Sequence, residues 1–372
     1  MTEAEKLAWL RLARTENVGP VTFHQLVARY GSATAALEAL PELAARGGLK
    51  RKLTVPSPAE CEKELAALKH AKAAVLASCE TDYPALLKQI PDAPPVLLVQ
   101  GHANLLHKPC VAFVGARNAS LNGRRLAEKL ARDVGQAGWI VVSGLAAGID
   151  GAAHQGALTT GTIGVIAGGF DHIYPPEHAA LYDKLRESCV IVTEMPLGTG
   201  IKPQLFPRRN RIVSGLCRGT VVIEAALKSG SLITARLATE QGREVMAIPG
   251  SPLDPRSGGT NRLIKDGATL IEGAADILAC LEDISARESE APSFTPKPPE
   301  KIDESAVDAA RLTLLSALSP VPVPVDEVIR LCDLPSPVVS AALLELELAG
   351  RVTRLPGNQV ALVATDALAG AV

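Results

Sequence analysis

The sequence predicts an α/β protein in which a central parallel sheet is preceded by a small helical domain and followed by helices with a β-hairpin. Short β-branched runs alternate with amphipathic helical stretches in the middle of the chain, and these runs are apolar throughout. Strands with this pattern belong to parallel sheets that helices cover on both faces. A segment rich in proline and acidic residues then separates this part from the last helices.

Residues 1–72 predict a helical domain of the SAM or helix-hairpin-helix kind. Apolar residues recur at helical spacing, and residues 18–21, which include Gly19 and Pro20, interrupt them. A turn of this kind before a helix can offer backbone N–H groups to a phosphate. An ordinary turn between two helices is the alternative, and it is favoured because no lysine follows the turn directly.

The predicted sheet lies within residues 73–285. The strands expected there are residues 111–114, 140–142, 163–166, 190–192, 220–223 and 244–248. Amphipathic helices are predicted between them, for example over residues 121–136 and 232–241. Ligands of open parallel sheets bind beyond the carboxyl ends of the strands. The loops that lead from strand to helix are therefore where a site is expected.

The end of the chain predicts a linker and a winged-helix-like domain. Residues 286–305 contain four prolines and five acidic residues, which favours an extended linker. In residues 306–372, helices are expected at 309–318, 325–332 and 337–349, and a hairpin at 351–355 and 359–362. The third helix takes the recognition-helix position, yet it carries Glu345 and Glu347 and no basic residue. This composition predicts contact with protein rather than with DNA.

Composition limits the ways in which the chain could bind a polyanion. The 372 residues carry 38 Lys and Arg against 40 Asp and Glu, and only 3% are aromatic. A net charge of −2 excludes a uniformly basic surface, and so few rings exclude binding by stacking base after base. The absence of a leader-like start, of an 18-residue apolar run and of paired cysteines predicts a cytoplasmic protein without membrane contact.

Two glycine-containing loops are candidates for phosphate binding. In the first, Gly115 allows a tight turn and Arg117 adds a guanidinium group. In the second, Gly144 and Gly148 flank a loop that opens a helix, where backbone N–H groups attract anions. Neither loop matches the dinucleotide fingerprint or the Walker motif. On the helix that follows this second loop, Asp150 and His154 could form an acid–base pair. We favour the alternative, in which Asp150 interacts with the dipole at the helix start and His154 packs beside it.

A third loop carries two of the few aromatic residues. Phe170 and Tyr174 follow a predicted strand, and either ring could stack on one base. The alternative, that both rings belong to the core, is equally consistent with the sequence.

The fourth candidate combines charge with another helix start. The 29 residues between Glu194 and Glu224 contain no acid and five bases. A run of one sign in a nearly neutral protein predicts a phosphate-binding surface. These bases are Lys202, Arg208, Arg209, Arg211 and Arg218. The next loop, with Ser229, Gly230 and Ser231, opens another helix that could hold a phosphate.

These motifs together resemble the DNA-processing protein A family, also called DprA or Smf. The resemblance covers residues 80–280 and is carried by GAR, SGLAAGIDGAAH, FPRRNRIVSGL, EAALKSGSLITA and AIPGSPLDPRSGGTNRLIKDGA. It implies an extended Rossmann-like domain between the helical and winged-helix-like ones. It also implies a non-enzymatic homodimer that binds and protects single-stranded DNA and loads the RecA recombinase onto it in natural transformation.

The resemblance also implies which residues contact DNA and which join two copies of the chain. The implied DNA-binding residues that match family motifs are Gly115, Arg117, Arg208, Arg209, Asn210, Arg211, Ser229, Gly230, Ser231 and Thr234. Lys202, Gly144, Gly148 and Phe170 are added from the residue patterns above. Leu263 and Ile264 fall near the family's self-association surface. One departure is Pro176, followed by Glu177, where several relatives carry a DNA-contacting lysine or arginine; Lys184 or Arg186 could compensate.

Two enzyme classes are the alternatives. Asp150, Asp171, Glu194 and Glu224 follow predicted strands, as the carboxylates of a nucleotide phosphoribohydrolase could. No metal-ligand or nucleophile motif accompanies them, and we favour the explanation that they cap helices or pair with arginine. A dehydrogenase is disfavoured because the dinucleotide fingerprint is missing. We therefore expect no cofactor and no metal.

Overall fold

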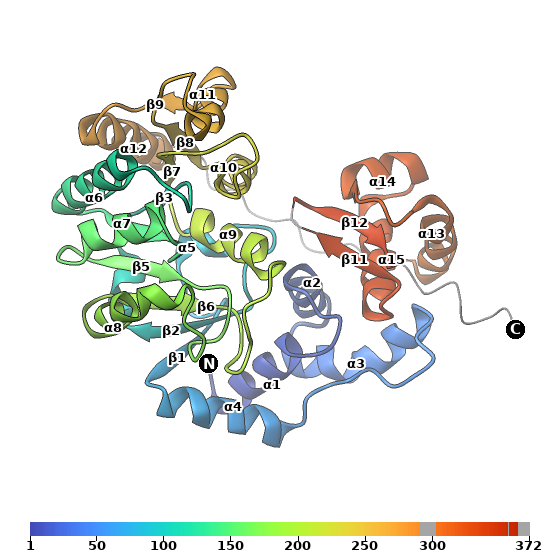
Figure 1. Ribbon diagram of the computed structural model, residues 1–372. Helices are drawn as coiled ribbons and strands as arrows, with labels where there is room; N and C mark the ends of the chain where they lie inside the picture. Colours follow the sequence, from blue (N-terminus) through green and yellow to red (C-terminus); the bar gives the residue numbers. More distant parts are fainter. Residues whose placement is uncertain (291–302, 356, 364–372) are drawn as a thin grey trace, which may run out of the picture. The chain divides into compact units, whose positions relative to one another are not determined.

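The computed structural model describes residues 1–290, 303–355 and 357–363 (Figure 1). It divides into two compact units. One is Glu64–Ser293, and in the other Met1–Lys63 joins Phe294–Val372. Within the described residues, no helix combines the length and the apolar character needed to cross a membrane.

The larger unit is built on a nine-stranded sheet in the order β1-β2-β6-β5-β4-β3-β7-β8-β9. Strand β2 pairs antiparallel with both β1 and β6, and all other neighbouring strands pair parallel. The strands are β1 Ala73–Ala77, β2 Val96–Gly101, β3 Cys110–Val114, β4 Ile140–Ser143, β5 Thr162–Val165, β6 Val190–Thr193, β7 Gly219–Val222, β8 Glu244–Ala247 and β9 Thr269–Leu270. The predicted parallel sheet is confirmed, and all six expected strands belong to it.

The sequence patterns missed β1, β2 and β9, for identifiable reasons. The β1 segment AAVLA is mostly alanine, which has low strand propensity, and β9 has two residues. Strand β2 pairs antiparallel with its neighbours at an edge region, so no crossover helix marks it.

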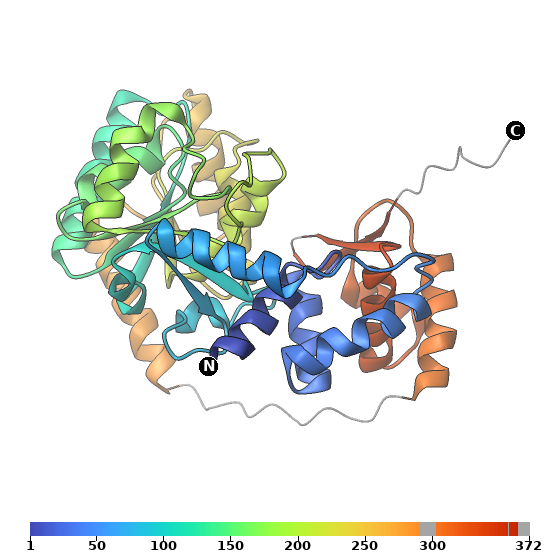
Figure 2. The ribbon, with the colours of Figure 1, turned by 90° about the horizontal axis from the view of Figure 1, so that it is seen from below.

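Helices cover both faces of this sheet (Figures 1 and 2). Helices α6, α7 and α12 share a core with β3, β4 and β7 that includes Phe113, Leu130, Val141 and Ile149. Helices α9 and α10 pack together on the other face. The helices are α5 Ala85–Lys88, α6 Leu121–Gln136, α7 Ile149–Ala157, α8 Ala179–Ser188, α9 Leu205–Gly215, α10 Ser231–Glu240, α11 Gly258–Lys265 and α12 Ala274–Glu290. Short 3-10 turns η1 Ala103–His107, η2 Pro176–His178 and η3 Pro255–Ser257 join them.

The smaller unit combines the two ends of the chain. Its N-terminal helices are α1 Glu3–Ala13, α2 Pro20–Tyr30, α3 Ala33–Arg46 and the first part of α4 Pro58–His70. Its C-terminal part has helices α13 Glu304–Ala317, α14 Val325–Cys332 and α15 Ser336–Leu348, with a sheet of β10 Val323–Pro324, β12 Gln359–Leu362 and β11 Val352–Leu355. Three helices closed by a hairpin confirm the winged-helix-like plan.

The predicted linker is shorter than expected at both ends. Helix α12 extends to Glu290, and α13 begins at Glu304, where Asp303 accepts a hydrogen bond from the backbone of Ser305. Residues 291–302 lie outside the described residues. The domain boundaries at residues 72, 285 and 305 stay predictions.

Candidate nucleic-acid interface

The first two glycine loops interlock at the carboxyl ends of β3 and β4. The backbone N–H of Ile149 donates to the carbonyl of Ala116 at 3.2 Å. Gly148 has φ +82°, and a Cβ there would overlap backbone atoms of Ala116 and Arg117. A Cβ at Gly115 would lie 2.5 Å from the Ile149 side chain. Both glycines are therefore needed for the loops to approach each other, and their closeness presents Arg117 at the surface.

Arg117 is the start of an accessible cation–aromatic cluster. Its guanidinium carbon lies 4.7 Å from the centre of the Phe206 ring, within the range of a cation–π contact. The Phe206 ring in turn lies 5.5 Å from the ring of Tyr174, tilted by 57°. Tyr174 is 37% exposed, and Arg117 is exposed as well. We name Arg117, Tyr174 and Phe206 the aromatic–arginine cluster; it offers one cation and two rings at one place.

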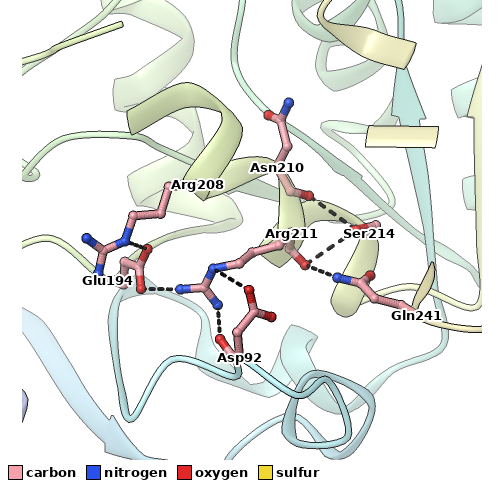
Figure 3. A network of polar contacts seen from close by, with 7 residues as sticks. All are labelled: Asp92, Glu194, Arg208, Asn210, Arg211, Ser214 and Gln241. Carbon is pink, nitrogen blue, oxygen red and sulfur yellow. Dashed lines mark hydrogen bonds and ion pairs between the residues drawn. The ribbon is translucent and has the colours of Figure 1, made fainter. Parts of the chain in front are cut away.

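Two of the three arginines of α9, Arg209 and Arg211, are buried, and Figure 3 shows the contacts of Arg208 and Arg211. The Glu194 carboxylate accepts hydrogen bonds from Arg208 Nε at 3.0 Å and from Arg211 Nη2 at 2.5 Å. Arg211 also pairs with the Asp92 carboxylate at 3.6 Å and donates to the Asp92 carbonyl. The Arg211 side chain is 3% exposed, whereas that of Arg208 is 47% exposed. Arg211 thus ties α9 to the loop before β2, and Arg208 remains at the surface.

Arg209 is buried beneath the second glycine loop. Its Nη1 donates to the Val165 carbonyl at 2.9 Å, and a Cβ at Gly144 would overlap the guanidinium group. The Asp150 carboxylate accepts from the backbone N–H groups of Gly144 and Ala146 at 3.2 and 3.3 Å. Burial raises the pKa of Asp150, and the positive charge of Arg209 opposes that rise. The pair therefore holds the loop from inside the protein.

His154 packs beside this pair, as the favoured interpretation of the Asp150/His154 spacing expected. The Thr162 hydroxyl donates to the Val141 carbonyl at 2.6 Å, so its oxygen accepts from His154 Nδ1 at 2.8 Å. The imidazole is fully buried, and this burial lowers the pKa of His154 to about 3. The histidine is consequently neutral at physiological pH.

Burial corrects the expectation of direct DNA contact at several predicted positions. Phe170 is 3% exposed and belongs to the core, which was its alternative interpretation. The side chains of Arg209, Arg211, Ser231 and Thr234 are buried too, because α9 and α10 pack these faces against the sheet and each other. Contact there would have to come from backbone groups.

Other predicted residues are accessible. Lys202 and Gly230 are exposed, and Ser229 and Asn210 are half-buried. The Asn210 side chain points away from the Arg211–Glu194 pair in Figure 3. The Ser229 and Ser231 hydroxyl groups lie 2.8 Å apart at the start of α10. Accessible polar groups therefore follow both β6 and β7.

Of the two basic residues that could compensate for the missing base at Pro176, one is accessible. Arg186 donates to the Gln100 side chain at 3.0 Å and to the Phe170 carbonyl at 2.8 Å, so it has an internal role. Lys184 is exposed. The sequence patterns did not single out Phe206 as a stacking ring. Its position directly before the arginines of the basic run could have indicated that role.

Each of the four carboxylates that an enzyme could use accepts hydrogen bonds within the protein. Glu224 accepts from the Ser120 backbone at 2.9 Å and from its hydroxyl at 2.5 Å, and Asp171 accepts from the Gly198 backbone at 2.9 Å. Glu194 and Asp150 are bound as described above. In the part of the chain that the structure describes, no group of His, Cys, Asp and Glu side chains could hold a metal ion.

Comparison with known proteins decides the family. The family model described as "DNA recombination-mediator protein A" matches residues 74–282, more than half of the chain. This chain belongs to the DNA processing protein A family. Models of a DprA-like N-terminal HHH domain and a DprA winged helix domain match residues 3–67 and 295–358.

Similar relatives and solved structures come from several bacteria. The chain is 44% identical over 211 residues to the Bacillus subtilis DNA processing protein DprA, covering 56% of this chain and 71% of that one. It is 41% identical over 283 residues to the Escherichia coli protein Smf, covering 75% of each. The X-ray structure of DprA from Streptococcus pneumoniae is similar with a TM-score of 0.62 and 35% identity, over 75% of this chain and 98% of that one.

A second solved structure bears on binding. DNA processing protein A from Helicobacter pylori, whose structure is described as giving insight into a unique single-stranded DNA binding mode, has a TM-score of 0.52 and 29% identity. That similarity covers 57% of this chain and 96% of the other.

Proposed function

We propose that the unit Glu64–Ser293 binds single-stranded DNA along the carboxyl ends of β3, β4, β6 and β7. The aromatic–arginine cluster carries this proposal, because Arg117 can bind a phosphate while Tyr174 and Phe206 stack on a base. Lys202, Arg208 and the start of α10 extend the same edge with further phosphate contacts. The relatives that are named for DNA processing, and the Helicobacter pylori structure, support the proposal.

The buried arginines serve this site without touching DNA through their side chains. Arg209 holds the Gly144–Gly148 loop, and Arg211 fixes α9, from which Phe206 and Arg208 project. Preorganised groups lose less entropy on binding, so these internal pairs raise affinity indirectly. Because phosphates supply most contacts, binding is salt-dependent and has little sequence preference.

The first experiment compares Arg117→Ala with Arg132→Ala in the full chain. Arg132 is an exposed arginine on α6 that pairs with Glu128, so it serves as a matched loss of one surface charge. Fluorescence anisotropy with an oligothymidine across a salt series should show that Arg117→Ala weakens binding about tenfold or more. The slope of log affinity against log salt should fall by about 0.7 for the lost phosphate contact.

Arg132→Ala should leave both quantities unchanged. Equal effects of the two substitutions would place the DNA elsewhere. Tyr174→Ala should weaken binding by about 1–3 kcal/mol without a change in salt slope, since stacking releases no counterions.

We further propose that the chain acts in the cytoplasm as a non-enzymatic homodimer that protects incoming DNA and loads RecA during transformation or general recombination. Leu263 and Ile264 are half-buried on α11 and would contribute the self-association surface. Sedimentation of Leu263→Asp should give a monomer if this face joins two copies.

RecA filament nucleation on protein-bound single strands should slow in Arg117→Ala. An unchanged rate would separate RecA loading from this site.

A further inference from the structure

Helix α15 occupies the position from which a winged helix contacts DNA, yet nearly all of it is buried. On one side, Val339, Ala342 and Leu346 belong to the core of the winged-helix-like part. On another side, α15 packs against α2 and α3 of the same compact unit. Only the first residues of the helix are exposed. The protein contact that its acidic residues predicted is therefore made within the chain, to the N-terminal helices.

Glu347 places its carboxylate at the start of α2. The carboxylate accepts a hydrogen bond from the Thr22 hydroxyl at 2.5 Å and faces the Gly19 position, where a Cβ would lie 3.5 Å from its oxygen. Helix α2 begins at Pro20 without a side-chain cap, so the positive end of its dipole is open to an anion. Burial raises the pKa of Glu347, and Arg354 at 3.2 Å opposes that rise. Glu347 thus places a negative charge beside the start of α2.

Glu345 lies at the C-terminal end of α3, where it pairs with Arg46, and it also pairs with Arg311 of its own part of the chain. Its carboxylate lies 3.3 Å from Arg46 Nε, and Glu304 pairs with the same guanidinium at 3.2 Å. A Cβ at Gly47 would overlap the backbone carbonyl of Glu345, so the close approach requires glycine there. The Asn17 side chain donates to the Leu348 carbonyl at 3.1 Å, which adds a third polar contact. The two surfaces are fitted to each other in both shape and charge.

The N-terminal side of this contact has the chemistry of a phosphate site. A helix start, a hydroxyl and a guanidinium are the groups that proteins use to hold a DNA backbone. Carboxylates of the C-terminal part contact the hydroxyl and the guanidinium and lie beside the helix start. We propose that the contact is autoinhibitory: Glu345 and Glu347 take the places of backbone phosphates of duplex DNA on α2 and α3, and α15 must leave before this face binds DNA. The proposal is independent of the single-strand site on the larger unit.

The decisive variant is a steric wedge at Gly47. Its φ is −68°, which any residue adopts, so Gly47→Leu opposes the contact with α15 without straining the backbone. Gly273→Leu is the matched control, because a Cβ at Gly273 would meet nothing within 4 Å. Hydrogen exchange should rise in α2 and α15 of the Gly47 variant alone. Its affinity for a 30-base-pair duplex, measured in the full chain carrying Arg117→Ala, should rise about tenfold, as expected for the release of a coupled contact.

Two further variants test whether the carboxylates and Arg46 account for the change in duplex affinity. Glu345→Ala with Glu347→Ala removes the two carboxylates without a wedge and should raise duplex affinity in the same way. Arg46→Ala, added to Gly47→Leu, should abolish the gain. If exchange rises in α2 and α15 while duplex affinity stays at the control value, autoinhibition is wrong. If neither variant raises exchange, the contact does not open and the proposal is equally wrong. Loss of single-strand binding in Arg117→Ala affects none of these outcomes.

Discussion

Helices α9 and α15 both bury charged side chains, but with opposite signs and different consequences. On α9 the buried charges are Arg209 and Arg211, whose acidic partners Asp150, Glu194 and Asp92 belong to the same unit. On α15 they are Glu345 and Glu347, whose partners include Arg46 and Thr22 from the other end of the chain. The first set fixes the frame of a site; the second joins two segments far apart in sequence.

The difference shows that the sequence of charged residues does not by itself predict which of them are exposed at the surface. The acid-free run between Glu194 and Glu224, which includes α9, suggested five bases for DNA, yet Arg209 and Arg211 are internal. The acidic α15 suggested an external partner, yet its carboxylates are taken by the chain itself. Burying an ion is unfavourable unless a partner is near, so buried charges identify built contacts.

The largest effect should come from Arg211→Ala. It leaves the nearly buried Glu194 without its strongest partner, and breaking such a pair costs about 3–5 kcal/mol of unfolding free energy. Urea unfolding followed by circular dichroism measures the loss. Arg208→Ala removes the exposed partner of the same carboxylate and should cost less than about 1 kcal/mol. Equal losses for the two variants would contradict the internal role of Arg211.

An intermediate effect should appear on acidification. Burial holds the pKa of His154 at about 3, below the usual value of 6.5, so the unfolded chain binds the proton first. Stability is therefore complete above pH 6.5 and falls as pH decreases toward 3. Between pH 7.5 and pH 5 the loss from this group is about 2 kcal/mol.

His154→Gln should remove that part of the pH dependence. His107→Gln, at an exposed histidine, should retain it. Parallel pH profiles for the wild type and His154→Gln would mean that another group is responsible.

The smallest effect should come from Thr22→Val at the α15 contact. The substitution keeps the shape of the side chain and removes the hydroxyl that donates to Glu347, which should cost about 1–2 kcal/mol. Thermal unfolding of the full chain measures it, with Thr22→Ser as the control that keeps the hydroxyl. A Thr22→Val protein as stable as the wild type would show that Arg354 alone sustains the carboxylate.

Local pattern predicted the elements well where one periodicity dominates. Helices α6 and α14 have the predicted bounds, and no end of the six expected strands differs from the observed one by more than one residue. Strands β1 and β2 were missed because alanine and flanking prolines give weak local signals and their pairing is antiparallel. Likewise, the residue patterns identified the loops of the candidate site but left open whether Phe170 and Tyr174 were accessible, and they did not single out the ring of Phe206.

The sequence by itself determined the parallel sheet, the winged-helix plan and the family, since periodicity and long motifs are properties of consecutive residues. Only the tertiary structure decided which charges face outward. Arg208 and Arg209 are neighbours on one helix, but a rotation of 100° per residue sends one toward solvent and the other beneath Gly144. Thr22 and Arg46, which contact Glu347 and Glu345, lie some 300 residues away along the chain, beyond the reach of any local pattern.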